Sequence, residues 1–184
     1  LLTPEIISFV AGSKKLMPHF HIPLQSGDDE ILGRMRRRYR RDLYADRVAL
    51  IKDLMPHCAI GVDVIVGFPT ETDAHFENTY RFLENLPISY LHVFTYSERA
   101  QTHALDLKPV VPQAVRHARN KKLRQLSYYK MQAFTQTQVG SSRSVLFEEH
   151  NKNGMMEGYT DNYMRIATPY RSEWAGQIID WTIV

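Results

Sequence analysis

Two short polar segments follow apolar runs, and their residue types suit the binding of a small polar ligand. Gln25 and Ser26 come directly after one run and offer an amide and a hydroxyl, groups suited to a ribose or an amino-acid head group. Gly67 follows a second run, and without a side chain it lets the backbone approach a ligand closely. Each has a structural alternative, because Gln25 and Ser26 could cap the next helix and Gly67 could form an ordinary turn.

Four ionisable residues near these segments have structural roles as their favoured interpretation. Arg37 could bind a carboxylate or phosphate through two hydrogen bonds, but it is one of six clustered arginines, for which a solvated position is favoured. Glu71 is interpreted as a charge that stabilises a helix N-terminus, in preference to a ligand role. His21 and His92 lie in apolar runs and are predicted to be core histidines. No group of His and Cys has the spacing of a metal site, so no metal ligand and no catalytic residue is predicted.

A parallel sheet would place the ligand-binding segments together. Three short apolar runs are predicted strands, namely Phe20–Leu24, Ile60–Phe68 and Tyr90–Tyr96. The second run shows little alternation, which is typical of a strand buried on both faces. Helices are predicted to begin after Thr3, after Asp28, near Asp42 and after Thr72. This alternation predicts an α/β fold with right-handed βαβ units, whose ligands bind at the carboxyl ends of the strands.

The last third of the chain has a different pattern. Pro112 is predicted to begin a long basic helix that runs to about Gln138, and Gly140 follows it. Four short strands are then predicted, at 143–149, 155–159, 163–167 and 177–184. We therefore predict an α/β domain over residues 1–139 and a small β-barrel over residues 140–184.

Basic residues gather in two stretches of the chain. Six arginines and no acid lie between Arg34 and Arg41, and eight further Lys and Arg residues and no acid lie between Leu107 and Phe147. The other nine basic residues are outnumbered by 20 acidic ones. Two such zones favour a polyanionic partner such as RNA or DNA, or a phosphate-bearing ligand. The alternative for either zone is a solvated helix face.

Composition excludes several classes of protein. Of the 184 residues, 43% are hydrophobic and 23% are charged, which excludes a disordered chain, and no apolar run is long enough to cross a bilayer. The single cysteine, Cys58, excludes internal disulfides, suits the cytoplasm and cannot by itself supply the three thiolates of an iron–sulfur site. Because the sequence begins without Met, we interpret it as a fragment of a longer protein.

Three segments in this order and spacing resemble the methylthiotransferase family of radical S-adenosylmethionine enzymes. They are His21–Gly27 with Met35–Tyr39, Asp63–Thr72, and His92–Arg99. The tail is similar to the TRAM domain of that family in Val145–Glu148 and Gly158–Tyr163. Three details look most like the branch that methylthiolates threonylcarbamoyl-adenosine beside the tRNA anticodon, namely Arg37–Tyr39, Ser97–Arg99 and Asn162–Tyr163. The family usually has Gly at position 70 and Pro-Gly at positions 100 and 101, where this chain has Thr70, Ala100 and Gln101.

The resemblance implies a fold, cofactors and a partner. The fold would be the C-terminal half of a partial (β/α) barrel followed by an OB-like TRAM barrel. The full-length enzyme would use S-adenosyl-L-methionine and two 4Fe-4S clusters, with no cluster ligand in this chain. The partner would be tRNA, and the open edge of the half-barrel would favour self-association. Two alternatives are methylthiolation of an aspartate in a ribosomal protein, and an RNA-binding module without catalysis.

The resemblance also implies two sets of site residues. The cofactor-binding set is Gln25, Ser26, Arg37, Ile65, Gly67, Phe68, Tyr96 and Ser97. The nucleic-acid-binding set is Lys121, Lys122, Arg124, Arg143, Lys152, Arg165 and Arg171.

Overall fold

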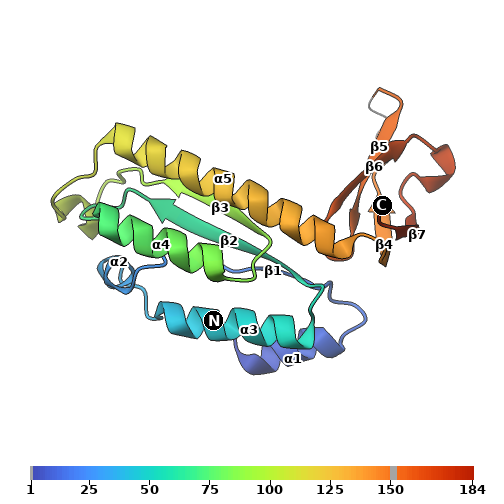
Figure 1. Ribbon diagram of the computed structural model, residues 1–184, viewed down its shortest axis with the longest axis horizontal. Helices are drawn as coiled ribbons and strands as arrows, with labels where there is room; N and C mark the ends of the chain where they lie inside the picture. The colour runs from blue at the N-terminus through green and yellow to red at the C-terminus, as the bar shows by residue number, and fades with distance from the viewer. Residues whose placement is uncertain (1, 150–152) are drawn as a thin grey trace.

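A three-stranded parallel sheet organises the first two thirds of the protein (Figure 1). The computed structural model describes residues 2–149 and 153–184. The strands lie in the order β1 (His19–His21), β2 (Ala59–Val66) and β3 (Tyr90–Thr95). The helices are α1 (Pro4–Gly12), α2 (Asp29–Arg34), α3 (Arg41–Leu54), α4 (Asp73–Asn85) and α5 (Gln113–Gln138), with a 3₁₀ turn η1 at His103–Asp106. The predicted α/β alternation is confirmed.

Local capping explains where three of these helices begin. The Thr3 hydroxyl accepts a hydrogen bond from the Ile6 N–H, and the Asp28 carboxylate accepts from the N–H groups of residues 30 and 31. Thr72 forms a capping box with His75, in which each side chain accepts from the other residue's backbone N–H. Each cap satisfies N–H groups that have no partner within the helix, so the three predicted helix starts are confirmed.

The hydrophobic core lies on one face of the parallel sheet. Val62, Val64 and Val66 of β2 are fully buried, and they pack with residues of α3, α4 and α5. The opposite face of β2 carries Asp63 and Ile65, which are only half-buried. The continuous apolar run predicted that β2 is buried on both faces. This prediction is wrong for Asp63 and Ile65.

β1 is shorter than its predicted range because the chain leaves the regular ladder after His21. Pro23 has no N–H to donate. The chain stays beside β2 even so, since the N–H groups of Leu24 and Gln25 both donate to the Asp63 carbonyl, at 3.1 and 2.9 Å. Gln25 also forms an isolated parallel bridge with Val64. The carboxyl end of β1 therefore stays aligned with β2 as far as Gln25.

A four-stranded antiparallel sheet follows α5, in the order β6-β5-β4-β7. Its strands are β4 (Ser142–Phe147), β5 (Met155–Thr160), β6 (Arg165–Pro169) and β7 (Ile178–Thr182), with a 3₁₀ turn η2 at Ser172–Trp174. Phe147, Met156, Trp174 and Trp181 pack into a small core of their own. The four predicted strands are confirmed within two residues at every end, while their closure into a TRAM barrel stays a prediction.

The antiparallel sheet lies beside the starts of the parallel strands, away from their carboxyl ends (Figure 1). The Tyr163 ring stacks on His19 at the beginning of β1, with ring centroids 4.4 Å apart. Asn162 donates to the His57 carbonyl, just before β2. The two sheets are thus joined at the end of the parallel sheet opposite to the carboxyl ends of its strands.

Candidate cofactor site and nucleic-acid interface

A cavity of about 420 Å³ opens at the carboxyl ends of the parallel strands. Its lining includes Gln25, Ile65, Tyr96 and Ser97, four of the eight residues predicted to bind the cofactor. Asp63 and Phe94 lie deeper along the same strands and also line it. The structure therefore brings together residues up to 72 positions apart in the sequence, as the strand-end argument requires.

Gln25 reaches this cavity from an unusual backbone conformation. Its φ of +72° lies in the left-handed region, which costs a residue other than Gly about 1 kcal/mol or more. The Gln25 N–H donates to the Asp63 carbonyl, and the Gln25 carbonyl accepts from the Ile65 N–H, both at 2.9 Å. β2 thus holds Gln25 in the strained conformation that places its side chain in the cavity lining.

Tyr96 lines this cavity and carries a hydroxyl group that needs a hydrogen-bond partner. Among the described residues, its hydroxyl is one of the few buried side-chain oxygens without a hydrogen-bond partner. Two neighbours fix the Tyr96 ring. The Phe68 ring packs edge-on with its centroid 5.4 Å away, and Cζ of Arg116 lies 5.4 Å from the centroid of the Tyr96 ring. A rigidly held hydroxyl with no protein partner beside a cavity fits a polar ligand such as S-adenosylmethionine.

Ser26 and Gly67 have partners within the protein. The Ser26 hydroxyl is buried and lies 3.2 Å from the Thr79 hydroxyl, and it also accepts from the Asp28 N–H. Gly67 has φ +76°, and a Cβ there would overlap the side chain of Arg116. The glycine therefore makes room for an arginine, and the serine hydroxyl organises the turn before α2.

The role of Glu71 goes beyond that of a negative charge near a helix N-terminus. Its carboxylate is almost fully buried, accepts from the Gly67 N–H at 3.1 Å and pairs with Arg119 at 2.6 Å. Burial raises the pKa of the Glu71 carboxyl, while the Gly67 N–H and Arg119 act in the opposite direction. This buried pair fixes the loop after β2 to α5.

Arg37 lies on the exposed segment after α2, outside the residues that line the cavity. Its cofactor role stays a prediction. Two other loop positions depart from the pattern of the family that the sequence resembles. Thr70 and Gln101, which stand at positions usually held by Gly, have φ values of +74° and +63°. Both are left-handed positions that favour glycine, so the departures leave local strain in the loops that follow β2 and β3.

His21 and His92 are not core residues, and that prediction is wrong. Their side chains are 34% and 53% exposed on the uncovered face of the parallel sheet. His21 Nε2 lies 2.8 Å from Asp63 Oδ1, and His92 Nδ1 lies 3.4 Å from the same oxygen. Sequence spacing could not reveal this cluster, because its members are 42 and 29 residues apart. The strand register is the signal that finds it, since Asp63 is paired directly with His92.

The basic zone of α5 is acid-free in sequence but not in space. Arg116 pairs with Glu98 at 2.6 Å, Arg119 with Glu71, and Lys122 with Glu77 at 3.2 Å. These three cations are therefore already paired within the protein, and nucleic-acid binding by the basic zone stays a prediction. Lys121 and Arg124 remain on the exposed side of the helix.

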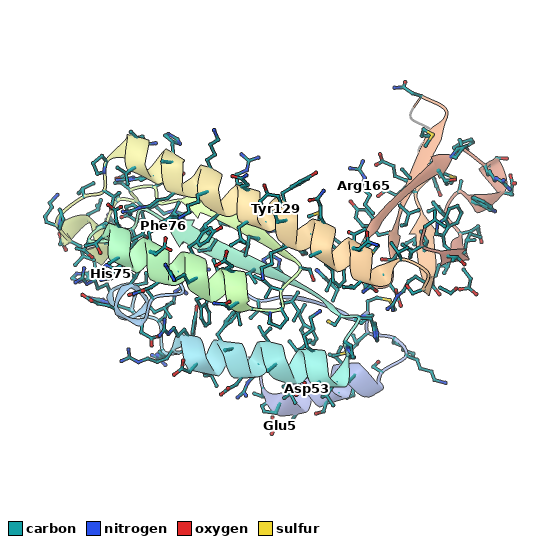
Figure 2. All side chains as sticks on the ribbon, in the orientation of Figure 1. Glu5, Asp53, His75, Phe76, Tyr129 and Arg165 are labelled. Carbon is teal, nitrogen blue, oxygen red and sulfur yellow. The ribbon has the colours of Figure 1, made fainter. Side chains whose placement is uncertain are left out.

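The cations predicted in the C-terminal sheet differ in exposure. Arg143 is only 13% exposed and bonds the Gln138 side chain and Asp161. Arg165 is exposed and pairs with Glu157, and Figure 2 shows it on the side of the sheet that faces α5. Arg171 is exposed, with its guanidinium 4.3 Å above the Trp174 ring. Lys152 lies outside the described residues. The exposed predicted cations are therefore Lys121, Lys122, Arg124, Arg165 and Arg171.

Comparison with known proteins defines first the class and then the family. Residues 1–83 match the radical SAM superfamily. Over 157 residues the chain is 41% identical to the threonylcarbamoyladenosine tRNA methylthiotransferase MtaB of Aquifex aeolicus, covering 85% of this chain and 38% of that protein. It is 36% identical over 182 residues to MtaB of Bacillus subtilis, covering 97% of this chain and 40% of that protein. The chain belongs to the methylthiotransferase family of radical SAM enzymes.

A second group of relatives is more distant. The tRNA-2-methylthio-N(6)-dimethylallyladenosine synthase of Staphylococcus epidermidis is 33% identical over 181 residues, covering 97% of this chain and 35% of that protein. The chain thus spans about two fifths of the length of the relatives that it matches. No helix within 2–149 or 153–184 is long and apolar enough to cross a membrane.

Proposed function

We propose that the whole protein is a tRNA methylthiotransferase that adds a methylthio group to threonylcarbamoyl-modified adenosine next to the anticodon. The observation that carries this proposal is the cavity at the strand ends, which combines the left-handed Gln25 with the unpartnered Tyr96 hydroxyl. Relatives named for this reaction align with almost the whole chain. The reaction would take place in the cytoplasm, where its tRNA substrate is found.

S-adenosyl-L-methionine would bind in this cavity and, together with two 4Fe-4S clusters, supply the radical, sulfur and methyl chemistry. The residues that would hold it are Gln25, Ile65, Tyr96 and Ser97. Phe68 and Gly67 would act indirectly. Phe68 would fix the Tyr96 ring, and Gly67 would leave room for the Arg116 side chain. Ser26 would act in the same indirect way, by fixing the turn that follows Gln25.

The cluster ligands would come from a part of the protein outside this chain. The only cysteine, Cys58, is fully buried, and burial raises the pKa of its thiol to about 11. A thiol held in its neutral form in the core is a poor ligand, because iron binds the thiolate.

The activity is tested on the nucleosides of total tRNA. Deleting the gene should remove methylthio-threonylcarbamoyl-adenosine. Threonylcarbamoyl-adenosine without the methylthio group should accumulate in its place. The full gene should restore the product, whereas the Tyr96→Phe variant should restore clearly less, since it lacks only the unpartnered hydroxyl. Unchanged nucleosides in the deletion strain would exclude this substrate. Loss of methylthio-dimethylallyladenosine would show instead that dimethylallyl-adenosine is the substrate.

Binding of tRNA by this chain should depend on salt, and on α5 the cations that contribute should be Lys121 and Arg124, because Lys122 is paired with Glu77. We propose that the C-terminal sheet is a TRAM domain and that it binds tRNA backbone together with α5. The slope of log affinity against log salt should be about −3 to −5 for a handful of phosphate contacts. The Lys121→Gln, Arg124→Gln double variant should flatten this slope by about 1.5 to 2, as measured by filter binding at several salt concentrations.

Lys122→Gln is the matched control for this experiment. It removes one charge from the same helix, but that charge is already paired with Glu77 and lies 4.3 Å from the centre of the Tyr80 ring. Its slope should stay close to that of the parent chain. Equal slopes for all three proteins would mean that α5 is a solvated face and that tRNA binds elsewhere.

A further inference from the structure

The uncovered face of the parallel sheet gathers three ligand-type side chains from three adjacent strands. His21 lies on β1, Asp63 on β2 and His92 on β3. Each offers one donor atom, and these atoms all lie within 4.8 Å of one another. Neighbouring strands of a rigid sheet hold metal-binding side chains more firmly than loops do. Two imidazoles and one carboxylate form a donor set that metalloenzymes use for zinc and other late divalent ions.

The distances suit such an ion. Bonds of 2.0–2.2 Å in a tetrahedral site place neighbouring ligand atoms about 3.3 Å apart. His92 Nδ1 is already 3.4 Å from Asp63 Oδ1. His21 Nε2 is 2.8 Å from the same oxygen, in a hydrogen bond that would open by about 0.5 Å on metal binding. The His21 proton would then sit on Nδ1, so that the lone pair of Nε2 faces the ion.

Tyr90 and Gly61 restrict the orientation of the histidine rings. The Tyr90 ring crosses Gly61, where any Cβ would overlap it, and its hydroxyl lies 2.8 Å from His19 Nε2. In this position the centroid of the Tyr90 ring lies 5.3 Å from the centroid of the His92 ring and 6.5 Å from that of the His21 ring. Both imidazoles thus lie between a fixed aromatic ring and the carboxylate that they share.

We propose that His21, Asp63 and His92 bind one divalent ion of the zinc type, with a fourth position open to an oxygen ligand. Asp63 also lines the 420 Å³ cavity at the strand ends, so the open position would face that cavity from its inner end. The site takes its donors entirely from this chain and holds no thiolate. It goes beyond the proposed methylthiotransferase function and does not depend on it.

Titration of the purified, chelator-dialysed 184-residue chain with Co²⁺ tests the proposal directly. One Co²⁺ per chain should bind and give the visible d–d absorption of a four- or five-coordinate ion, and Zn²⁺ should displace it. His21→Ala, Asp63→Asn and His92→Ala should each weaken binding at least tenfold, because even the loss of an outer-shell partner costs 10- to 100-fold. Zn²⁺ should also raise the melting temperature of the parent chain but not of these variants.

His103→Ala is the matched control, because His103 and Asp106 form an ordinary exposed His–Asp pair at 3.6 Å. Its affinity for Co²⁺ should equal that of the parent chain. If His21→Ala melts early without metal, His21→Gln replaces it, since the amide keeps a polar contact with Asp63. A variant that carries all three substitutions gives the background level of Co²⁺ binding. Stoichiometric binding that none of the three single variants weakens, or binding by the parent chain no stronger than this background, would overturn the proposal and leave the cluster as a hydrogen-bonded network.

Discussion

Replacing Arg119 with alanine should lower the free energy of unfolding by about 3 to 5 kcal/mol, the usual cost of breaking a buried ion pair. The Arg119 and Glu71 side chains are only 7% and 3% exposed. Arg119 also donates to the Glu71 carbonyl at 3.1 Å and to Asp73 at 2.7 Å. Its loss would leave the Glu71 carboxylate buried, with the Gly67 N–H as hydrogen-bond donor and His75 nearby but without its ion-pair partner. Urea unfolding followed by circular dichroism measures the change.

The pair should be strongly coupled. Arg119→Met with Glu71→Gln removes both charges at similar volume, so this double variant should be more stable than the sum of its single variants implies. Arg124→Ala is the control, since this exposed residue of the same helix should change stability by no more than about 0.5 kcal/mol. If Arg119→Ala cost no more than Arg124→Ala, the pair would not hold the loop after β2.

The same pair should make stability depend on pH, with a sign that follows from the direction of the Glu71 pKa shift. Burial raises the folded-state pKa of Glu71, so between its ordinary value and the raised value the folded protein binds more protons than the unfolded chain. The contribution of Glu71 to stability is therefore complete at low pH and is lost as the pH rises through the raised pKa. Glu71→Gln should remove this part of the pH profile.

This ion pair also shows why the sequence predicted helix starts better than the roles of charges. Thr3, Asp28 and Thr72 cap helices through N–H groups two or three residues away, so the signal is local. Glu71 has the same local context, but its partner Arg119 is 48 residues away. The acidic partners of α5 could not be predicted for the same reason, because Glu71, Glu77 and Glu98 come from other segments.

The candidate site was predictable to the extent that strand ends define it. Gln25, Ile65, Tyr96 and Ser97 line one cavity because three parallel strands end at one edge. The orientation of a side chain within a turn was not predictable, and Ser26 turns toward Thr79 instead. The cluster around Asp63 required the register of β2 and β3, which a run of apolar residues does not specify.

Asn162→Ala should uncouple the two sheets. Asn162 is fully buried, and its amide donates to the His57 carbonyl and to Gln138 Oε1, both at 2.9 Å. Its side-chain oxygen accepts from the Thr160 hydroxyl at 2.6 Å. Truncation would leave these buried groups short of partners, at about 1 to 3 kcal/mol for each unsatisfied group. We expect a loss of about 3 kcal/mol or more and, in calorimetry, two separate unfolding transitions in place of one.

Asn85→Ala is the control for this experiment, because that exposed amide only bonds the Arg81 carbonyl within its own helix. It should leave a single transition. The effect of Asn162→Ala on tRNA should also differ in kind from that of the α5 charge variant. Affinity should fall at every salt concentration while the salt slope stays unchanged, because no phosphate contact is removed and only the relative placement of the two binding surfaces is lost. A flatter slope would show instead that Asn162 supports the cations themselves, and an unchanged single transition would show that other contacts join the two sheets.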